Sequence, residues 1–213
     1  MVPRETEPAA EPEPAVAADL FGDRIDLARA FTADLIARGE PLGLIGPLEL
    51  PRIWTRHIVN SVLLAPLLVG TVGDVGTGAG LPGVVLAIAR PDVRFVLIEP
   101  MERRVAWLEE QKALLALDNV EVVRARAEEA PFPRKLDQVT ARAVGALSKL
   151  IPLTAPLVRP GGELLLLKGA AVEAEAAKAG KAISRWRLTD VRVEELGTGM
   201  ATEATRVFRA TVS

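Results

Sequence analysis

The spacing of hydrophobic residues changes once along the chain, near residue 71. Before that point, apolar side chains recur every three or four residues, at Phe21, Ile25, Ala28, Phe31 and Leu35. This spacing is typical of one face of an α-helix. The stretch LPRIWTRHIVNSVLLAPLL predicts a second helix that begins near Pro51. We therefore expect a small helical cap over residues 18–70.

After residue 71, short apolar runs alternate with longer amphipathic ones. The apolar runs predict strands at 71–75, 93–100, 119–126, 136–144, 163–169, 188–196 and 205–212, with helices at 82–90, 101–117, 147–158 and 170–186. Alternating strands and helices with nearly continuous apolar strands indicate a mostly parallel sheet covered on both faces. Residues 71–213 are thus predicted to form a seven-stranded α/β domain that ends in an antiparallel pair.

Residues 1–17 differ in composition from the rest, being rich in Pro, Glu and Ala. Such a segment has too few large apolar groups to offset the entropy of ordering, so we predict disorder. The segment carries a net charge of −3, against −2 for the whole chain. The remaining residues are close to neutral, which leaves room for a local basic face that binds phosphate.

Several classes of protein are disfavoured by what the chain lacks. It contains no cysteine, so disulfides, thiolate metal sites and a cysteine nucleophile are excluded. No apolar run approaches the roughly 18 residues of a membrane span, and the N-terminus lacks the pattern of a secretory signal. No cluster of histidine and carboxylates suggests a metal. We expect a cytoplasmic protein, without membrane partner or metal, that is a monomer.

The first candidate site is the stretch DVGTGAGLPG at residues 74–83, between a predicted strand and a predicted helix. Glycines at 76, 78 and 80 let the main chain approach a ligand closely at the carboxyl edge of a parallel sheet. Asp74 precedes them in a D-x-G-x-G-x-G pattern. A carboxylate there would repel a pyrophosphate and favours a cationic ligand that carries an ammonium and a sulfonium.

Acidic residues follow the next two strands. Glu99 ends the second strand, where a carboxylate can accept the ribose hydroxyls of an adenosine; the alternative is a solvated strand end. Ala127 and Glu128 follow the third strand, where an adenine would lie. Together with the glycine loop, these residues outline a site for S-adenosylmethionine.

The methyl acceptor is approached by elimination. Pyrimidine C5 methylation uses a cysteine, which is absent. The Asn/Asp-Pro-Pro-aromatic motif common in amine methylation is missing after the fourth strand, and the only histidine, His57, lies in the cap. An acceptor with a free lone pair, such as guanine N7, needs only alignment and stabilisation of charge.

Four stretches in order, IWTRHIVNS, DVGTGAGLPG, RAEE and ARAVGAL followed by LLLKG, give the chain its family resemblance. It resembles the bacterial RsmG (GidB) methyltransferases. The resemblance implies a class I methyltransferase fold of the Rossmann type, and transfer of a methyl group to guanine N7 in the decoding-centre loop of 16S ribosomal RNA. It also implies S-adenosylhomocysteine as product, and a cofactor site that uses Gly76, Leu81, Ala127, Glu128 and Arg142.

Basic side chains supply candidates for the RNA side. Arg56 and His57 lie in the second cap helix, and Arg103 and Arg104 open the helix that follows Glu99. For His57 a buried, satisfied imidazole is the alternative interpretation. Arg142 and Lys168 end the fourth and fifth strands, where we expect catalytic groups. Trp54 and Trp107 are predicted to be core residues.

Two other functions stay open on the sequence alone. A nicotinamide-dependent oxidoreductase can use the same sheet, although Asp74 disfavours it. A non-catalytic module that binds RNA or the small ribosomal subunit can retain the pocket without the reaction.

Overall fold

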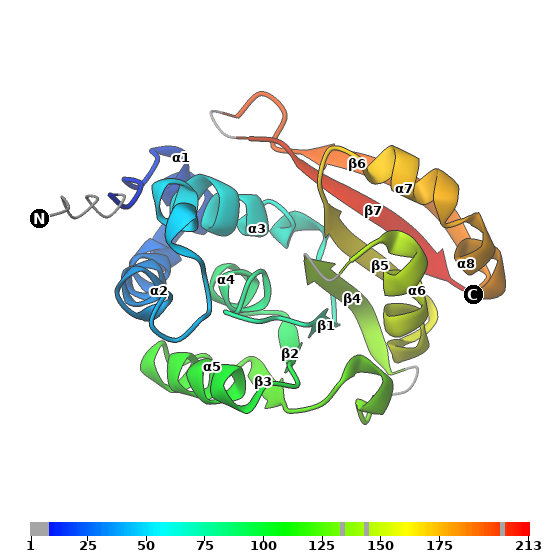
Figure 1. The fold of residues 1–213 in the computed structure, drawn as a ribbon, viewed down its shortest axis with the longest axis horizontal. Helices are drawn as coiled ribbons and strands as arrows, with labels where there is room; N and C mark the ends of the chain where they lie inside the picture. Colours follow the sequence, from blue (N-terminus) through cyan, green and yellow to red (C-terminus); the bar gives the residue numbers. More distant parts are fainter. Residues whose placement is uncertain (1–8, 133–134, 143–144, 201–202) are drawn as a thin grey trace, which may run out of the picture.

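A twisted seven-stranded sheet forms the centre of the molecule (Figure 1). The computed structural model describes residues 9–132, 135–142, 145–200 and 203–213. The strand order is β3-β2-β1-β4-β5-β7-β6. The strands are β1 (Thr71–Val75), β2 (Arg94–Ile98), β3 (Val120–Val123), β4 (Leu136–Arg142), β5 (Val158–Lys168), β6 (Leu188–Leu196) and β7 (Thr205–Val212).

The pairing confirms the predicted α/β class. Strands β1 to β5 are parallel, whereas β7 runs antiparallel between β5 and β6. The order reverses between β1 and β4, which pair side by side although two strands separate them in the sequence. In a parallel sheet this switch point is where the loops at the carboxyl ends diverge and leave a crevice for a ligand.

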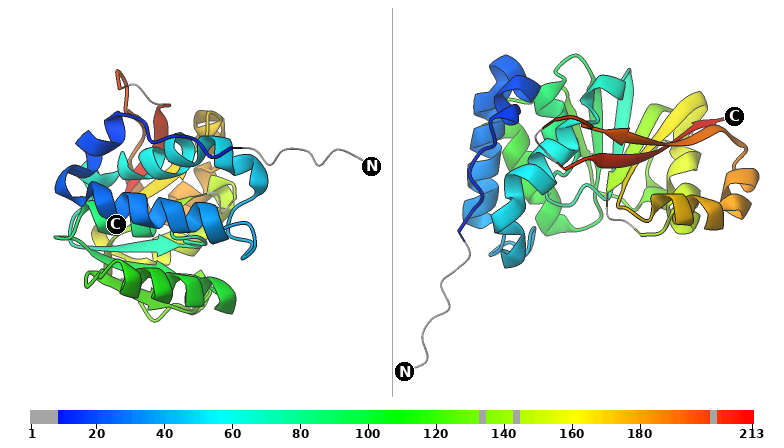
Figure 2. Two further views of the ribbon diagram at one scale, coloured as in Figure 1. Left: turned by 90° about the vertical axis from the view of Figure 1, so that its left-hand side faces the viewer. Right: turned by 90° about the horizontal axis from the view of Figure 1, so that it is seen from above.

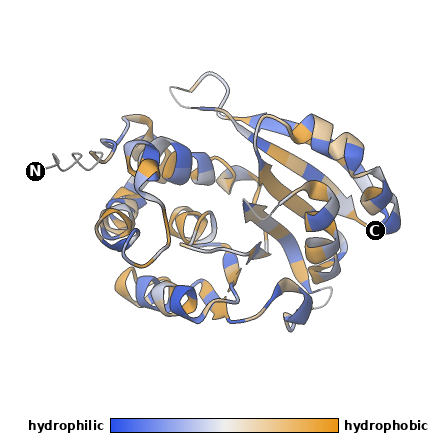
Figure 3. Ribbon diagram, in the orientation of Figure 1, coloured by the Kyte–Doolittle hydropathy of each residue, from blue (hydrophilic) through white to orange (hydrophobic). Residues whose placement is uncertain are grey.

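Alternate strand residues pack into two separate hydrophobic clusters, one on each face of the sheet. Phe95 and Leu97 of β2 belong to one cluster, and Val96 and Ile98 to the other. Since successive strand side chains point to opposite faces, both faces must be covered. Figure 3 shows hydrophobic residues along the strands, and helices that carry both hydrophobic and hydrophilic residues.

The helices divide between these faces. The first cluster includes residues of the cap and of α4 (Gly83–Ala89) and α5 (Glu102–Leu114). The second includes residues of α6 (Leu147–Thr154) and α7 (Val172–Lys178), with Ile183 of α8 (Gly180–Arg185) packed against it. In Figure 1 and in the right-hand view of Figure 2, the cap helices α1 and α2 lie at the opposite side of the molecule from α7 and α8. Trp54 and Trp107 are 5% and 2% exposed, which confirms them as core residues.

The cap contains less regular helix than the sequence predicts. Its first part is α1 (Val16–Phe21), a 3-10 turn (Gly22–Arg24) and α2 (Ile25–Arg38). The helix predicted from Pro51 is instead a 3-10 segment (Pro47–Arg52), a π-helix (Ile53–Val59), α3 (Asn60–Val62) and a 3-10 turn (Ala65–Leu67). A π-helix of this length is rare, and such segments are frequent at functional sites.

The prediction of disorder over 1–17 is wrong for its described part. Residues 1–8 lie outside the described residues, but 9–17 run along the cap. Glu11 accepts hydrogen bonds from the backbone N–H and the hydroxyl of Thr55, at 2.9 and 3.2 Å, and Glu13 pairs with Arg29. Specific ion pairs and hydrogen bonds, with the burial of Ala17, order a segment whose composition alone is too polar to do so.

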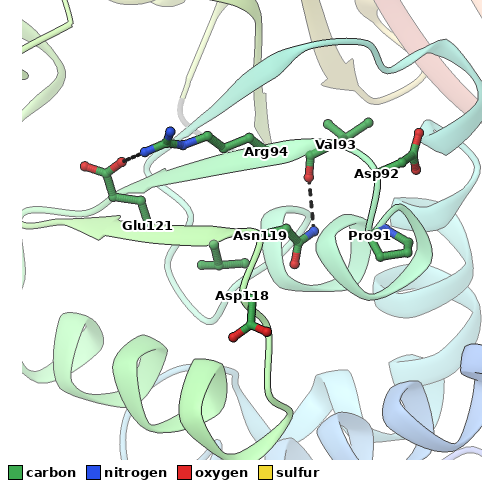
Figure 4. A pocket seen from close by; sticks show the side chains of 8 residues that line it. Pro91, Asp92, Val93, Arg94, Asp118, Asn119 and Glu121 are labelled. Carbon is green, nitrogen blue, oxygen red and sulfur yellow. Dashed lines mark hydrogen bonds and ion pairs between the residues drawn. The ribbon is translucent and has the colours of Figure 1, made fainter.

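Two local features complete the fold. The sequence predicted one helix over 170–186, but Ala179 separates α7 from α8, which begins at Gly180. At the amino ends of β2 and β3, Asn119 donates to three carbonyls, at 3.1 Å each. Figure 4 shows the bond to the Val93 carbonyl and the nearby pair of Arg94 and Glu121. These residues line a hollow at the amino ends of the strands, whereas the glycine loop follows the carboxyl end of β1. Within the described residues, no helix is long and apolar enough to cross a membrane.

The tight contact between the start of α4 and β2 gives a stability prediction. A Cβ at Gly83 would collide with the side chains of Leu97 and Asp74. We expect Gly83→Ala to lower the free energy of unfolding by about 1–3 kcal/mol, because neither buried neighbour can move freely. Urea denaturation measures this loss.

The matched control is Gly180→Ala, at the start of another helix, where an added Cβ meets nothing within 4 Å. Its unfolding midpoint should stay the same or rise slightly, since alanine restricts the unfolded chain. Equal effects of the two substitutions would contradict the packing argument.

Candidate active site

The glycine loop turns sharply between β1 and α4. Gly76 and Gly78 have φ of 68° and 58°, values that side chains other than glycine rarely adopt. The Gly76 N–H donates to the Ile98 carbonyl at 2.9 Å, so the loop is attached to the end of β2. The loop backbone and the ends of β1 and β2 thereby form one edge of the crevice at the switch point.

Asp74 lies beneath this loop, not in front of it. Its side chain is fully buried, and one oxygen accepts the Gly83 N–H at 2.8 Å. Burial raises the pKa of Asp74 to about 6, although the Gly83 N–H opposes the shift. Direct contact with a ligand ammonium stays a prediction; the geometry shows a brace that sets the shape of the loop.

Glu99 stands where the sequence placed it, at the end of β2, with 2% of its side chain exposed. It accepts the Gly78 N–H and the Met101 N–H, both at 3.0 Å. Arg104 approaches it to 3.8 Å, and the buried Nε of Arg104 has no partner among the described residues. A carboxylate and an unsatisfied guanidinium N–H therefore meet beside the loop.

These groups line a cavity of about 520 Å³, which we call the loop cavity. Its walls come from the glycine loop, from the end of β2 and from the cap. The residues that line it include Gly76, Gly78, Leu81, Glu99, Arg104 and Arg142 of the core and Leu44, Ile45, Gly46, Glu49 and His57 of the cap. A nucleoside fits this chemistry: glycine backbone at close approach, a carboxylate for hydroxyls and apolar side chains opposite.

The cap contributes a hydrogen-bonded chain to this wall. The His57 Nε2 lies 2.7 Å from a Glu49 oxygen, and its Nδ1 lies 3.0 Å from an Arg142 nitrogen. Because a guanidinium only donates and a carboxylate only accepts, the imidazole carries its proton on Nε2. Burial, and the Arg142 charge after it, lower the pKa of His57 to about 4. His57 is thus a neutral, satisfied imidazole in the wall of the site.

Arg142 ends β4 and reaches back to the cap, donating to the Arg56 carbonyl at 3.1 Å. Burial lowers its pKa to about 10, so the guanidinium keeps its charge at neutral pH. Beyond it lies a second cavity of about 460 Å³, the strand-end cavity. Arg142 and His57 line both cavities, and the second is also lined by Arg56, Asn60, Lys168, Glu175, Glu203 and Arg206.

Lys168 ends β5 in the strand-end cavity, but its ammonium is engaged. It donates to the Gly145 carbonyl at 2.6 Å and pairs with Glu175 at 2.8 Å. Glu175 in turn accepts the Leu147 N–H at 3.1 Å. Lys168 therefore ties the end of β5 to the segment that leads into α6, next to the second cavity. A direct catalytic role stays a prediction.

Other predicted residues lie outside the cavities. Ala127 and Glu128 form a short 3-10 turn after β3, beyond the residues that line the loop cavity. Gly80 packs against Val84, and Arg103 lies over Gly43 of the cap. Arg104 lines the loop cavity, and its predicted contact with RNA stays a prediction. No group of residues in the described part of the chain is arranged to hold a metal.

Sequence reasoning missed Glu49 and the apolar cap wall around Leu44 and Ile45. No motif marks them, because they lie in an irregular segment that only the packing of the cap brings to the loop. Arg206 was missed for a similar reason: it lies on β7, far along the chain from the other residues of the site.

A doubly covered sheet of this order, with a glycine loop after β1 and a carboxylate after β2, defines a class I S-adenosylmethionine-dependent methyltransferase. The family model described as rRNA small subunit methyltransferase G (GidB) matches residues 24–204. The chain belongs to this family, which leaves the nicotinamide alternative without support.

Curated relatives agree with this membership over almost the whole chain. A ribosomal RNA small subunit methyltransferase G from Clavibacter michiganensis is 69% identical over 204 residues, which cover 95% of this chain and 97% of that protein. One of the same name from Leifsonia xyli is 65% identical over 203 residues, with the same coverage.

Solved structures with low sequence identity share the fold. A SAM dependent methyltransferase from Aquifex aeolicus superposes with a TM-score of 0.57 at 21% identity, covering 76% of this chain and 94% of that one. A precorrin-6y C5,15-methyltransferase from Geobacter metallireducens gives 0.52 at 18% identity, covering 73% and 88%. These likenesses support the class I architecture.

The environment of His57 predicts an unusual titration. The chain has one histidine, so its NMR signals are unambiguous. We expect the folded protein to show no histidine titration between pH 7 and 5, and the urea-unfolded chain to titrate near the ordinary value of about 6.5.

This difference also sets the direction of a pH effect on stability. The folded pKa lies below the unfolded one, so the unfolded chain binds more protons between about pH 6.5 and 4. The His57 contribution to the free energy of unfolding should therefore fall as the pH falls through this window. A folded pKa near 6.5 would contradict the buried hydrogen-bond chain.

Proposed function

We propose that this protein transfers the methyl group of S-adenosylmethionine to N7 of a guanine in 16S ribosomal RNA. The family name and the names of the relatives specify small-subunit ribosomal RNA. The observation that carries the proposal is that the loop cavity and the strand-end cavity share His57 and Arg142. A cofactor in the first and a nucleotide in the second would meet at that wall.

The charges of the strand-end cavity suit a nucleotide. Arg56 and Arg206 supply positive charge for phosphate, whereas the charge of Lys168 is paired with Glu175. Glu203 also lines this cavity. Base-modifying enzymes draw a target base out of its stack into such a pocket. The side chains of Arg52 and Arg56 are about half exposed, at 47% and 50%, and Arg103 is also exposed. These exposed cations support the prediction of contacts with RNA phosphates around the two cavities.

Guanine N7 suits the groups that line the wall. The N7 lone pair attacks the methyl carbon, the carbon–sulfur bond breaks with its electrons, and the sulfonium becomes the thioether of S-adenosylhomocysteine. The positive charge passes to the purine, and no proton is removed. His57 is not placed as a base, because its Nδ1 lone pair already accepts from Arg142. The main demands are therefore alignment and electrostatics.

Arg142 is the group best placed to align the base. Two of its five N–H groups donate to Arg56 and His57. The others can donate to guanine O6, the acceptor beside N7 on the same base edge, and so direct the N7 lone pair toward the loop cavity. Arg142 also lines the cofactor side of the wall, as the family resemblance implies.

Mass spectrometry tests reaction, base and position together. Unmodified 16S RNA, naked or in the small subunit, is incubated with the protein and isotopically labelled S-adenosylmethionine, then digested with a nuclease. We expect one labelled fragment that contains N7-methylguanine. Label on another atom would contradict the proposed acceptor, and no label on either substrate would favour the non-catalytic RNA-binding module. The predictions of a cytoplasmic monomer stay open.

The cofactor assignment gives a binding prediction at Glu99. Glu99→Gln should weaken S-adenosylmethionine binding at least about tenfold, since hydrogen bonds to a charged acceptor contribute about 1.5–3 kcal/mol. Isothermal titration calorimetry measures the dissociation constant without RNA.

Glu121→Gln is the matched control, because Glu121 lies on the neighbouring strand β3 in an exposed pair with Arg94. It should leave cofactor affinity unchanged. Equal affinity of Glu99→Gln and the unmodified protein would place the ribose elsewhere.

A further inference from the structure

Glu49 is a cap carboxylate that lines the loop cavity beside His57 and Arg142. Both of its oxygens are engaged: one accepts from Arg52 at 2.6 Å, and the other lies 2.7 Å from His57 Nε2. Arg56 approaches the second oxygen to 3.5 Å. The carboxylate is thus held by the cap itself, and a group from the cofactor would have to compete with these partners.

The contacts of His57 have only one consistent direction. Arg142 can only donate, so Nδ1 accepts; Glu49 can only accept, so Nε2 carries the proton. The chain of donors runs from Arg142 through His57 to Glu49. A proton on Nδ1 would set two donors against each other and break the contact with Arg142.

We infer that Glu49 is a positioning residue for methyl transfer: through His57 it fixes the Arg142 guanidinium in the wall between the two cavities. This inference rests on the proposed function. Arginine side chains lose much rotamer freedom when they are fixed, and this guanidinium is held by two groups of the π-helix, the His57 ring and the Arg56 carbonyl. Glu49 orients the ring that completes this hold.

Cap and core are also joined at a second place, away from the contacts of Arg142 with His57 and Arg56. Arg38 of α2 pairs with Glu110 of α5 at 2.7 Å, also joining cap to core. Neither residue of that pair lines either cavity. Glu110 therefore provides a control carboxylate, one that joins the cap to the core without contacting His57 or Arg142.

Single-turnover kinetics with 16S RNA test the inference. Glu49→Ala should lower the rate of methyl transfer about 10–100-fold, because small misplacements of aligning groups are costly. The dissociation constant of S-adenosylmethionine should stay within about threefold. Glu49→Gln should recover most of the rate, since an amide oxygen can still accept from Nε2. Glu110→Ala should transfer methyl at the unmodified rate, even if it unfolds at a lower temperature.

Two results would overturn the inference. One is an unchanged rate in folded Glu49→Ala. The other is a loss of cofactor affinity as large as the loss of rate, which would make Glu49 a direct cofactor ligand. Circular dichroism establishes that each variant is folded, and the Gln variant supplies the answer if the Ala variant is not.

A spectroscopic measurement without substrate keeps this inference separate from the proposed function. In protein labelled with ¹⁵N-histidine, we expect the single imidazole to be the Nε2–H tautomer, and Glu49→Ala to shift it toward a mixture. A wild-type Nδ1–H tautomer would overturn the inference whatever the activity. Failure of the unmodified protein to methylate 16S RNA would refute the proposed function, while the imidazole spectrum would still decide whether the hydrogen-bond chain exists.

Discussion

The hydrogen bond from the Gly83 N–H to the Asp74 carboxylate fixes the relation between β1 and α4, and the site depends on that relation. Both groups are buried, and the carboxylate pKa is raised by its surroundings. A buried carboxyl is costly unless it is paired. Glycines have no side chain that could hold the loop in its left-handed conformation, so the Asp74 carboxylate braces the loop from below. The loop backbone is left facing the cavity.

The cap supplies the other wall, and its role is chemical as well as steric. A neutral imidazole between a carboxylate and a guanidinium makes the junction rigid without offering a proton acceptor to the substrate. Such a wall suits a reaction in which the acceptor atom is already nucleophilic. It would serve poorly where a hydroxyl or an amine must first be deprotonated. The π-helix matters here because it presents the His57 ring and the Arg56 carbonyl to one guanidinium.

The sequence predicted the sheet well and the cap less well, for a physical reason. Strand periodicity and the order of elements depend on local pattern, so all seven strands, the antiparallel ending and the glycine loop were found. At Ile53–Val59 the sequence predicted an α-helix and the structure has a π-helix. Tertiary packing can override the local pattern in this way, and helical periodicity does not reveal it. Residues 9–17 were misjudged because composition does not show that Glu11 meets the Thr55 N–H.

In the site, residues at strand ends were predictable and residues of the irregular cap segment were not. Glu99 and Arg142 follow apolar runs directly, so topology alone brings them to one edge. Glu49 has no such marker, and its place depends on how the 3-10 segment packs. The burial of Asp74 beneath the loop was also beyond the sequence, since D-x-G-x-G-x-G does not distinguish a carboxylate that faces a ligand from one that braces the backbone.

The position of β7 has a consequence for how the protein is made. This last strand lies inside the sheet, between β5 and β6, and its Val207 shares a hydrophobic cluster with Phe31 near the start of the chain. Neither the sheet nor the hydrophobic cluster shared with the cap can complete its packing before β7 has been synthesised. A nascent chain that lacks β7 is therefore incompletely folded, and loss of residues 205–212 would remove an interior strand of the sheet, not an edge strand.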